Sequence, residues 1–259
     1  MDKAETPGSD WQIVDQQRDQ MLRMVTRGFY KELVNYGAGR GEILRIATHL
    51  LDNILNQNPA AEPLQPPPGT NLRLRAVQDH WKDRRSVIVD QVTLRPLRPE
   101  LIPCLMEWLN APGAADSFFP AFPTDGQALE NHFCGSPTCD YLAIEVEGRP
   151  VGIIGGESLD RTSGRVEMRK LVGDPTLRGQ GIGKRATFGF LYYAFNILNL
   201  HKVYIHSRDI NVRNLNINRS LGFEVEGVFL EEVATPQGRR ADIVRMALLR
   251  PIWLALFGG

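Results

Sequence analysis

The chain of 259 residues contains only three cysteines, too few for the disulfide framework that stabilises many small secreted domains. Cys134 and Cys139 have no second Cys or His pair at the spacing of a zinc site, and Cys104 stands alone. The sequence therefore predicts free thiols and no bound metal. Because free thiols are typical of a reducing compartment, we expect a cytoplasmic protein.

The sequence also lacks long apolar runs and an excess of charge of either sign. Its longest apolar runs, such as residues 188–191 and 252–257, fall far short of the roughly 20 residues that a membrane-spanning helix needs. The first ten residues are polar and acidic, unlike a secretory signal peptide. Lys plus Arg and Asp plus Glu both total 30. We therefore expect no membrane partner and no nucleic-acid partner.

The clearest change in composition lies at residues 58–70, which contain five prolines and are expected to form a stiff, extended connector. Before it, residues 15–36 and 42–56 carry apolar residues at helical spacing. Two helices of this size cannot bury a core of their own, so we expect them to pack on the main domain or on a partner. The predicted divisions are an N-terminal helical appendage at 1–57, a proline-rich connector and basic segment at 58–90, and a main domain at 91–259.

Strands and helices alternate irregularly in the main domain, which predicts an α+β fold around a mostly antiparallel sheet. Apolar alternation and turn residues predict strands at 92–97, 141–146, 151–156, 165–172, 201–207, 224–231 and 243–249. Helical spacing predicts helices at 100–110, 126–133, 182–198 and 212–220.

A glycine-rich loop lies between the predicted strand at 165–172 and the long helix that follows it. It reads Leu-Val-Gly-Asp-Pro-Thr-Leu-Arg-Gly-Gln-Gly-Ile-Gly-Lys over residues 171–184. Its glycines allow backbone N–H groups to approach a ligand closely, and the N-terminus of the following helix favours an anion such as a pyrophosphate. The spacing fits neither a Rossmann dinucleotide site nor a P-loop, which requires Gly-x-x-x-x-Gly-Lys-Ser/Thr.

Residues 178–183, Arg-Gly-Gln-Gly-Ile-Gly, resemble the signature Arg/Gln-x-x-Gly-x-Gly/Ala of the GNAT superfamily of N-acetyltransferases. A second block of that family is matched at residues 211–223, which begin with Asn and end in Leu-Gly-Phe. Leu-Arg-Pro-Leu at residues 94–97 and Trp108 resemble the branch of ribosomal-protein N-terminal acetyltransferases.

The resemblance implies a GNAT-like twisted mixed sheet flanked by helices, with acetyl-CoA or another acyl-CoA bound in a V-shaped cleft between the fourth and fifth strands. It implies an N-acyltransferase that acylates an amine directly. The N-terminal helical appendage favours a small-molecule acceptor, for example in a natural-product pathway. It also implies a set of donor-binding residues: Leu171, Val172, Gly173, Arg178, Gly179, Gln180, Gly181, Ile182, Gly183, Lys184 and Asn211.

Glu167, on the strand before the loop, is the first candidate for the base that deprotonates the amine, and Glu157 and His206 are the alternatives. Asn218 stands where the family commonly has a Tyr that donates to the departing sulfur. An amide cannot act as an acid, although it can hydrogen-bond a thiolate, so the sequence leaves the acid unassigned. No partner pattern gives a role to His49, His80, His132 or His201.

Several alternatives stay open. The donor is either a free acyl-CoA or an acyl carrier protein, which carries the same pantetheine arm and would need a basic docking surface. The acceptor is either a small amine or a protein N-terminus. Without the Tyr, the domain also fits a non-catalytic CoA-binding module. We expect a monomer or a homodimer. The candidate docking surface consists of Arg73, Arg75, Lys82, Arg84 and Arg85.

Overall fold

The computed structural model describes residues 9–55, 71–111, 125–177, 179–208, 212–234, 238 and 240–258. Side chains are described in these ranges except at residues 9–21, 48–55, 208, 212, 213 and 215. The chain divides into two compact units, residues 1–62 and 63–259. Most of the proline-rich connector lies outside the described residues, and the predicted division into appendage, connector and main domain stays a prediction.

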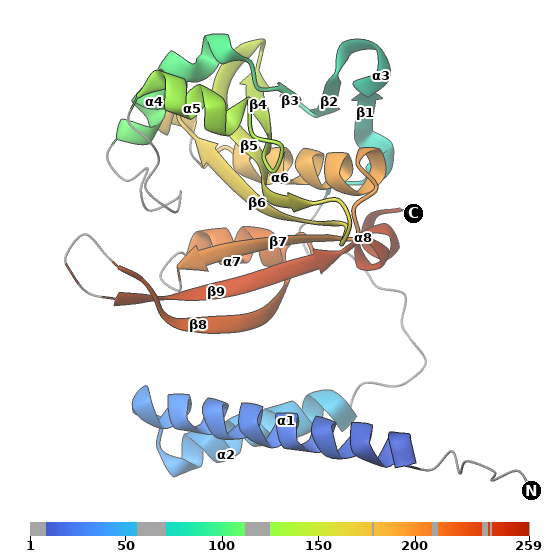
Figure 1. Ribbon diagram of the computed structural model, residues 1–259, viewed down its shortest axis with the longest axis vertical. Coiled ribbons are helices and arrows are strands. Elements are labelled where there is room, and N and C mark those ends of the chain that lie inside the picture. The colour runs from blue at the N-terminus through green and yellow to red at the C-terminus, as the bar shows by residue number, and fades with distance from the viewer. Residues whose placement is uncertain are drawn as a thin grey trace, which may run out of the picture. The chain divides into compact units, whose positions relative to one another are not determined.

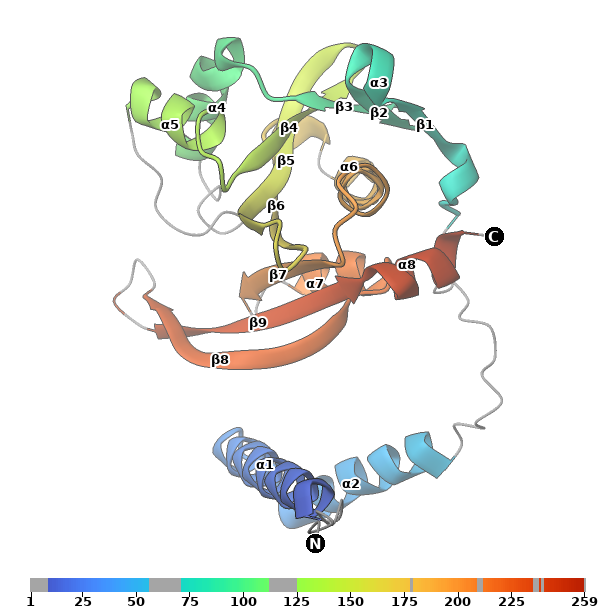
Figure 2. The ribbon, with the colours of Figure 1, turned by 45° about the vertical axis from the view of Figure 1, so that its right-hand side comes forward.

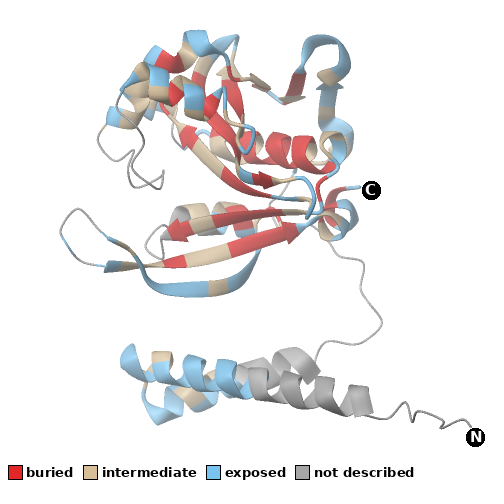
Figure 3. Cartoon of the chain, in the orientation of Figure 1, coloured by how far each residue is buried: buried red, intermediate tan, exposed pale blue. Residues whose placement is uncertain are grey.

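The N-terminal unit consists of two helices, α1 (Ser9–Asn35) and α2 (Arg40–Leu55). They are joined by a turn in which Gly37 has a φ of 81°, and the Gly39 N–H donates to the Glu42 carboxylate at 2.9 Å. Of the side chains described in residues 22–47, none is buried (Figure 3). This part of the helix pair therefore forms no core of its own. Its large exposed apolar side chains are Leu22, Met24, Val25, Phe29, Tyr30, Val34, Tyr36 and Leu44.

The second unit is built on a sheet of nine strands with the order β1-β2-β3-β4-β5-β6-β7-β9-β8 (Figure 1). Only β6 and β7 pair in parallel among the described strands. The sheet is therefore mixed and mostly antiparallel, as the sequence predicts. The strands are β1 (Val77–His80), β2 (Ser86–Val89), β3 (Val92–Pro96), β4 (Asp140–Val146), β5 (Arg149–Asp160), β6 (Arg165–Val172), β7 (Lys202–Arg208), β8 (Glu224–Ala234) and β9 (Arg240–Leu249).

Helices cover both faces of the sheet. Figure 2 shows α6 end-on, enclosed between strands β1–β6 on one side and β7, β9 and α8 on the other, while α4 and α5 lie on the opposite face. The helices are α3 (Trp81–Arg84), α4 (Ile102–Asn110), α5 (Gly126–Phe133), α6 (Ile182–Tyr192), α7 (Val212–Arg219) and α8 (Arg250–Phe257). Short turns of 3-10 helix are η1 (Leu74–Ala76), η2 (Pro99–Leu101) and η4 (Pro175–Leu177), and the π-helical turn η5 (Tyr193–Ile197) extends α6.

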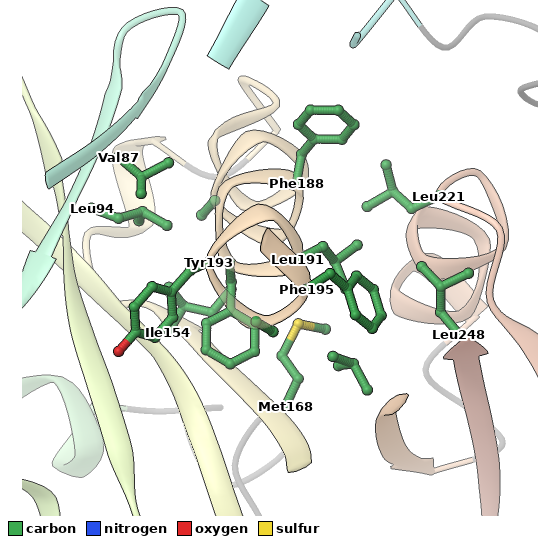
Figure 4. Packing of buried hydrophobic residues seen from close by; sticks show 14 of the residues in the cluster. Val87, Leu94, Ile154, Met168, Phe188, Leu191, Tyr193, Phe195, Leu221 and Leu248 are labelled. Atoms are coloured by element: carbon green, nitrogen blue, oxygen red, sulfur yellow. The ribbon is translucent and has the colours of Figure 1, made fainter. Parts of the chain in front are cut away.

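The larger core surrounds α6, which explains why this helix is apolar on nearly every side. Phe188 is fully buried and contacts two rings of α8, with centroids 4.7 Å from Trp253 and 5.1 Å from Phe257. Figure 4 shows Leu191 and Phe195 among strand residues from both halves of the sheet. Each such buried side chain contributes roughly 1.5–3 kcal/mol to stability. The packing of α6 therefore fixes the two halves of the sheet around it.

A smaller core lies on the opposite face, under α4 and α5. Leu105, Leu129 and Phe133 of the helices meet Tyr141 and Leu171 of the strands. Since Leu171 belongs to this face, the alternation of a strand places Glu167 and Arg169 on it as well, whereas Met168 and Lys170 face α6. The two faces of β6 thus carry different chemistry.

The predicted fold class is confirmed, and the strands and helices predicted after residue 90 are present with shifted ends. The prediction missed β1, α3 and β2, which precede residue 90, and α8 at the end of the described chain. Each of these missed elements has eight residues or fewer, too short for a clear periodic pattern. None of the described helices has the length and apolarity to cross a membrane.

Candidate active site

A cleft opens where the two parallel strands separate. β6 and β7 form just three residue pairs, the last of which joins Glu167 to Tyr204. Beyond this pair, β6 continues beside β5 and β7 beside β9, so the two strands diverge (Figure 1). The cleft has a volume of about 410 Å³ and is lined by the separated strand ends, the glycine loop, the first turn of α6 and one side of α7. Backbone groups of β6 that would otherwise pair with β7 face this space.

The glycine loop forms one wall of the cleft and leads into α6. Gly179 and Gly181 have φ angles of 92° and 78°, which favour glycine strongly over any other residue. A Cβ on Gly181 would also lie 2.5 Å from a guanidinium nitrogen of Arg185. Gly181 is the N-cap of α6, so the unpaired N–H groups of the first helical turn lie at the cleft. This arrangement suits a phosphate group.

Most of the predicted donor-binding residues described by the structure line the cleft, namely Leu171, Val172, Gly179, Gly181, Gly183 and Lys184. Gly173 instead packs against Trp108, whose ring lies 2.2 Å from where a Cβ would be. Gln180 donates to the carbonyl of Thr176, and Ile182 is buried in the α6 core. These three lie beside the cleft and not in its lining. Arg178 and Asn211 lie outside the described residues.

The three predicted catalytic side chains, Glu167, His206 and Asn218, all line the same cleft. Glu167 is 7% exposed, and its Oε1 lies 3.2 Å from His206 Nδ1 and 3.0 Å from an Arg169 guanidinium nitrogen. An ionised carboxylate only accepts hydrogen bonds, so Nδ1 of His206 is the donor in this pair. In the neutral imidazole, Nε2 then carries the free lone pair.

The surroundings of Glu167 keep it ionised. Burial acts to raise its pKa, but the hydrogen bond from His206 and the charge of Arg169 outweigh burial and hold the pKa below its ordinary value. A carboxylate with a lowered pKa is a poor proton acceptor at neutral pH. The geometry therefore favours Glu167 as the partner that orients His206 over Glu167 as the base itself.

Asn218 is fully buried on α7, and one of its polar atoms has no partner. Its Nδ2 donates to the Asn214 carbonyl at 2.9 Å, while its buried Oδ1 accepts no hydrogen bond from the described residues. The Asn214 contact fixes which end of the amide is the oxygen. This Oδ1 is therefore available to accept a hydrogen bond from a ligand N–H in the cleft.

The family described as "Acetyltransferase (GNAT) domain" matches residues 91–224, more than half of the chain. The chain belongs to the GNAT acetyltransferase family. Its GNAT domain is similar in fold to spermidine N-acetyltransferase of Vibrio cholerae in complex with CoA and spermine, with a TM-score of 0.58 and 24% sequence identity. That similarity covers 63% of this chain and 98% of the Vibrio chain. A dodecameric structure of the Vibrio enzyme is similar at a TM-score of 0.56 and 23% identity, over 63% of this chain and 96% of that one.

Curated relatives agree with this assignment. Spermidine N(1)-acetyltransferase of Escherichia coli K12 is 29% identical over 114 residues, which cover 44% of this chain and 60% of the relative. The Vibrio cholerae enzyme is 35% identical over 80 residues, 31% of this chain and 46% of the relative. The chain thus spans 60% or less of these relatives. They support the GNAT assignment but not the finer resemblance to ribosomal-protein N-terminal acetyltransferases.

Lys170 is a charged residue of the cleft in this GNAT domain that was not predicted from the sequence. It lies on the α6 face of β6, where Val166 and Met168 are buried and apolar. Its ammonium donates to Thr187 Oγ1 at 2.8 Å, and burial lowers its pKa to about 8. A lysine that interrupts the apolar register of a buried strand is the signal that would have identified it.

Glu157 lies across from Glu167 in the sheet and is the centre of a polar cluster on the α4/α5 face. Its carboxylate accepts from Tyr141 at 2.6 Å, lies 2.9 Å from His132 Nε2 and accepts from Cys139 at 3.4 Å. His132, to which the sequence assigned no role, is thus a partner of Glu157. In the described part of the chain, His132, Cys139 and Glu157 are the one group whose ligand atoms, within 4.8 Å of one another, suit a metal ion.

Two other described carboxylates on this face, Glu167 and Glu226, are paired with cations. Glu167 contacts Arg169, and Glu226 of β8 contacts Lys202 and lies 3.1 Å from Arg245. Arg245 also stacks over the Tyr204 ring at 4.1 Å from its centroid. This face is therefore polar without a large excess of negative charge.

Proposed function

We propose that this GNAT domain transfers an acyl group, acetyl in the simplest case, from a CoA-type thioester to a primary amine of a small molecule. One observation carries the proposal. The cleft between β6 and β7 runs from a glycine loop at the N-terminus of α6 to the buried Glu167 and its half-buried partner His206. The anion-binding end suits the phosphate groups of the donor. The proton-accepting end suits the amine acceptor, which must lose a proton when it attacks.

The donor lies along β6 in this proposal. Its pyrophosphate binds the N–H groups of the glycine loop and the first turn of α6, next to Lys184. Its pantetheine arm extends beside Leu171 and Val172, on the edge of β6 beyond its last residue pair with β7, as an added strand would. Oδ1 of Asn218 accepts an N–H of the arm, which satisfies an atom that is otherwise buried without a partner. The thioester then lies near Glu167.

His206 accepts the proton of the attacking amine in this mechanism, and Glu167 acts as a positioning residue. The amine nitrogen forms a bond to the thioester carbonyl carbon, the proton passes to Nε2 of His206, and the carbon–sulfur bond breaks. The charge that develops on the imidazole is stabilised by the Glu167 carboxylate at Nδ1. The sulfur leaves as a thiolate and takes its proton from water, because Asn218 is not an acid.

The acceptor is an amine with a single ammonium group in this proposal. The curated relatives are named spermidine acetyltransferases, which makes polyamines the natural first comparison. A polyamine carries several positive charges and is best bound by carboxylates that lack other partners. Here Glu167 and Glu226 are already paired with Arg169, Lys202 and Arg245. Repulsion from these cations disfavours a polycation.

The test measures thiol release from acetyl-CoA with a panel of acceptors and confirms each product by mass spectrometry. The panel contains spermidine, spermine, simple monoamines, amino sugars and a peptide with a free N-terminus. We expect turnover with monoamines or amino sugars, at a kcat/KM at least about tenfold above that of spermidine. Preference for spermidine would overturn the acceptor assignment. Tight CoA binding without turnover of any acceptor would identify a binding module and overturn the proposed reaction.

A further inference from the structure

Lys170 lies beneath the glycine loop, inside the donor end of the cleft. Its aliphatic stem passes Gly183, since a Cβ on that glycine would lie 3.8 Å from Lys170 Cδ. Its ammonium reaches Thr187 of α6, whose hydroxyl in turn donates to the Gly183 carbonyl at 2.8 Å. Thr187 therefore holds the ammonium against the first turn of the helix, close to the backbone groups that suit a phosphate.

This ammonium has no counterion among the described residues. It makes one hydrogen bond, to a neutral hydroxyl, although an ammonium has three N–H donors. Its neighbours on β6, Glu167 and Arg169, point to the opposite face of the sheet, where they pair with each other. A half-buried charge without an opposite charge is costly, which indicates that an anion completes the site.

Among the described residues that line the cleft, the elements packed around Lys170 supply only neutral or positive groups on its side of the sheet. The first turns of α6 carry Lys184 and Arg185, and Arg185 is paired with Asp90 at 2.8 Å. The cleft side of α7 carries the amides of Asn214 and Asn218. The β5 residue beside Lys170 in the ladder is the apolar Ile154, and the one titratable cleft residue of β7 is His206, on the opposite face.

We propose that Lys170 binds a phosphate group of the donor's phosphopantetheine arm, as a site separate from the backbone of the glycine loop. This inference rests on the proposed function and deepens it. The same chemistry is offered by free CoA and by a carrier-bound phosphopantetheine. A charge-assisted hydrogen bond from the ammonium to a phosphate oxygen would supply the missing opposite charge.

The site makes donor binding depend on pH. Burial lowers the pKa of the Lys170 ammonium to about 8 in the ligand-free protein. A bound phosphate favours the charged form and raises this pKa. Above pH 8, binding must therefore take up a proton, and the affinity for CoA falls as the pH rises. Below pH 8 the ammonium is already charged, and this contribution to the affinity levels off.

The experiment compares wild type, Lys170→Met and the control Lys202→Met by titration calorimetry. Lys202 is a strand lysine outside the cleft, paired with Glu226. The ligands are CoA, 4′-phosphopantetheine, pantetheine without phosphate, and a carrier protein bearing phosphopantetheine. We expect Lys170→Met to weaken CoA at least about tenfold, equivalent to about 1.4 kcal/mol, with pantetheine unaffected and the control unchanged. At pH 8.5, wild type should take up a proton on binding CoA and Lys170→Met should not.

The pattern across the phosphate-bearing ligands identifies the source of the phosphate. Equal loss with CoA, phosphopantetheine and the carrier supports the inference, because all three carry the phosphate next to pantetheine. Loss with CoA alone would overturn it, because that pattern assigns Lys170 to a phosphate that only CoA carries. Unchanged CoA affinity in folded Lys170→Met, or an equal loss with pantetheine, would overturn the inference. If wild type itself binds no CoA, the proposed function fails instead.

Thermal unfolding of the ligand-free proteins checks that the variant is folded and tests the buried charge independently. Because the folded-state pKa of Lys170 lies below that of an unfolded lysine, the unfolded state binds more protons between about pH 8 and pH 10.5. Wild type therefore gains stability across this window, and Lys170→Met does not. We expect the variant to melt at a higher temperature than wild type at pH 7 and to lose this advantage by pH 10.5. A variant that melts lower at pH 7 would contradict the unpaired charge.

Discussion

The charged side chains near the cleft are paired differently on the two faces of the sheet. On the α6 face, Lys170 and Lys184 lie at the cleft, and the described residues place no carboxylate within ion-pair distance of either. On the α4/α5 face, Glu167 and Glu226 each have a cation beside them. The α6 face therefore carries two lysines without a carboxylate partner among the described residues, whereas these two carboxylates of the α4/α5 face are each neutralised by an arginine.

This difference separates two kinds of recognition. Unpaired cations and helix N–H groups bind an anion without first breaking other contacts, so the donor site is ready for a phosphate. Paired carboxylates must give up a partner before they can bind an ammonium, so charge alone selects the acceptor weakly. We therefore expect shape and hydrogen bonding to select the acceptor. Substitutions at three places test this contrast: the Glu167–His206 pair, the glycine loop and Asn218.

The largest effect is expected at the Glu167–His206 pair. His206→Ala should lower kcat by about 10²–10⁴-fold, the usual contribution of a positioned base, with little change in CoA affinity. Glu167→Gln should lower kcat less, because the amide still accepts from Nδ1 but does not stabilise the positive ring. Since the two act as one unit, the double variant should lose no more than His206→Ala alone. Fully additive losses would show that Glu167 removes the proton itself.

An intermediate effect is expected at the glycine loop. Gly181→Val should weaken CoA binding at least about tenfold, because valine disfavours a φ of 78° and its side chain meets Arg185 at the donor site. The control is Gly148→Val, which replaces a glycine with a φ of 75° in the β4–β5 turn. Both substitutions strain the backbone alike, but only the first lies at the cleft. Equal CoA affinity in the two folded variants, by calorimetry, would remove the loop from the donor site.

The smallest effect is expected at Asn218. Replacing it with Leu removes the free Oδ1, which should raise KM for acetyl-CoA by roughly threefold to tenfold, as expected for one hydrogen bond of about 1 kcal/mol. The rate constant kcat should stay within about threefold of wild type. Ser220→Ala, at the end of the same helix, is the control, since its hydroxyl bonds the Ile217 carbonyl. A hundredfold loss of kcat would instead place Asn218 at the departing sulfur.

The sequence predicts the α6 face far better than the other. The glycine loop is a contiguous segment whose spacing has a direct physical meaning, so Gly179, Gly181 and Gly183 were identified and line the cleft. The pairing of Glu167 with His206 depends on which strands become neighbours, and residues 39 apart in the chain carry no local signal of contact. Glu157 with His132 is a second case of this kind.

The contacts that were not predicted from the sequence depend mostly on which side chains are buried together. The alternation of Val166, Met168 and Lys170 places this lysine on an apolar face of β6, but its lack of a described counterion depends on neighbours from other elements. Gly173 leaves room for the Trp108 ring, which lies 2.2 Å from where a Cβ on this glycine would be. That contact joins α4 to the end of β6, and no pattern in either segment predicts it.

The aromatic contact between α6 and α8 has a consequence for the cleft, although α8 contributes no residue to its lining. The two strands that form the cleft share three residue pairs, and we expect the helix packed behind them to determine how far they separate beyond these pairs. That helix is α6, held by Phe188 against Trp253 and Phe257. We therefore expect α8 to influence the width of the donor pocket through α6. Replacing Trp253 with a smaller residue should let α6 move and narrow the separation of β6 and β7, although Trp253 does not line the cleft.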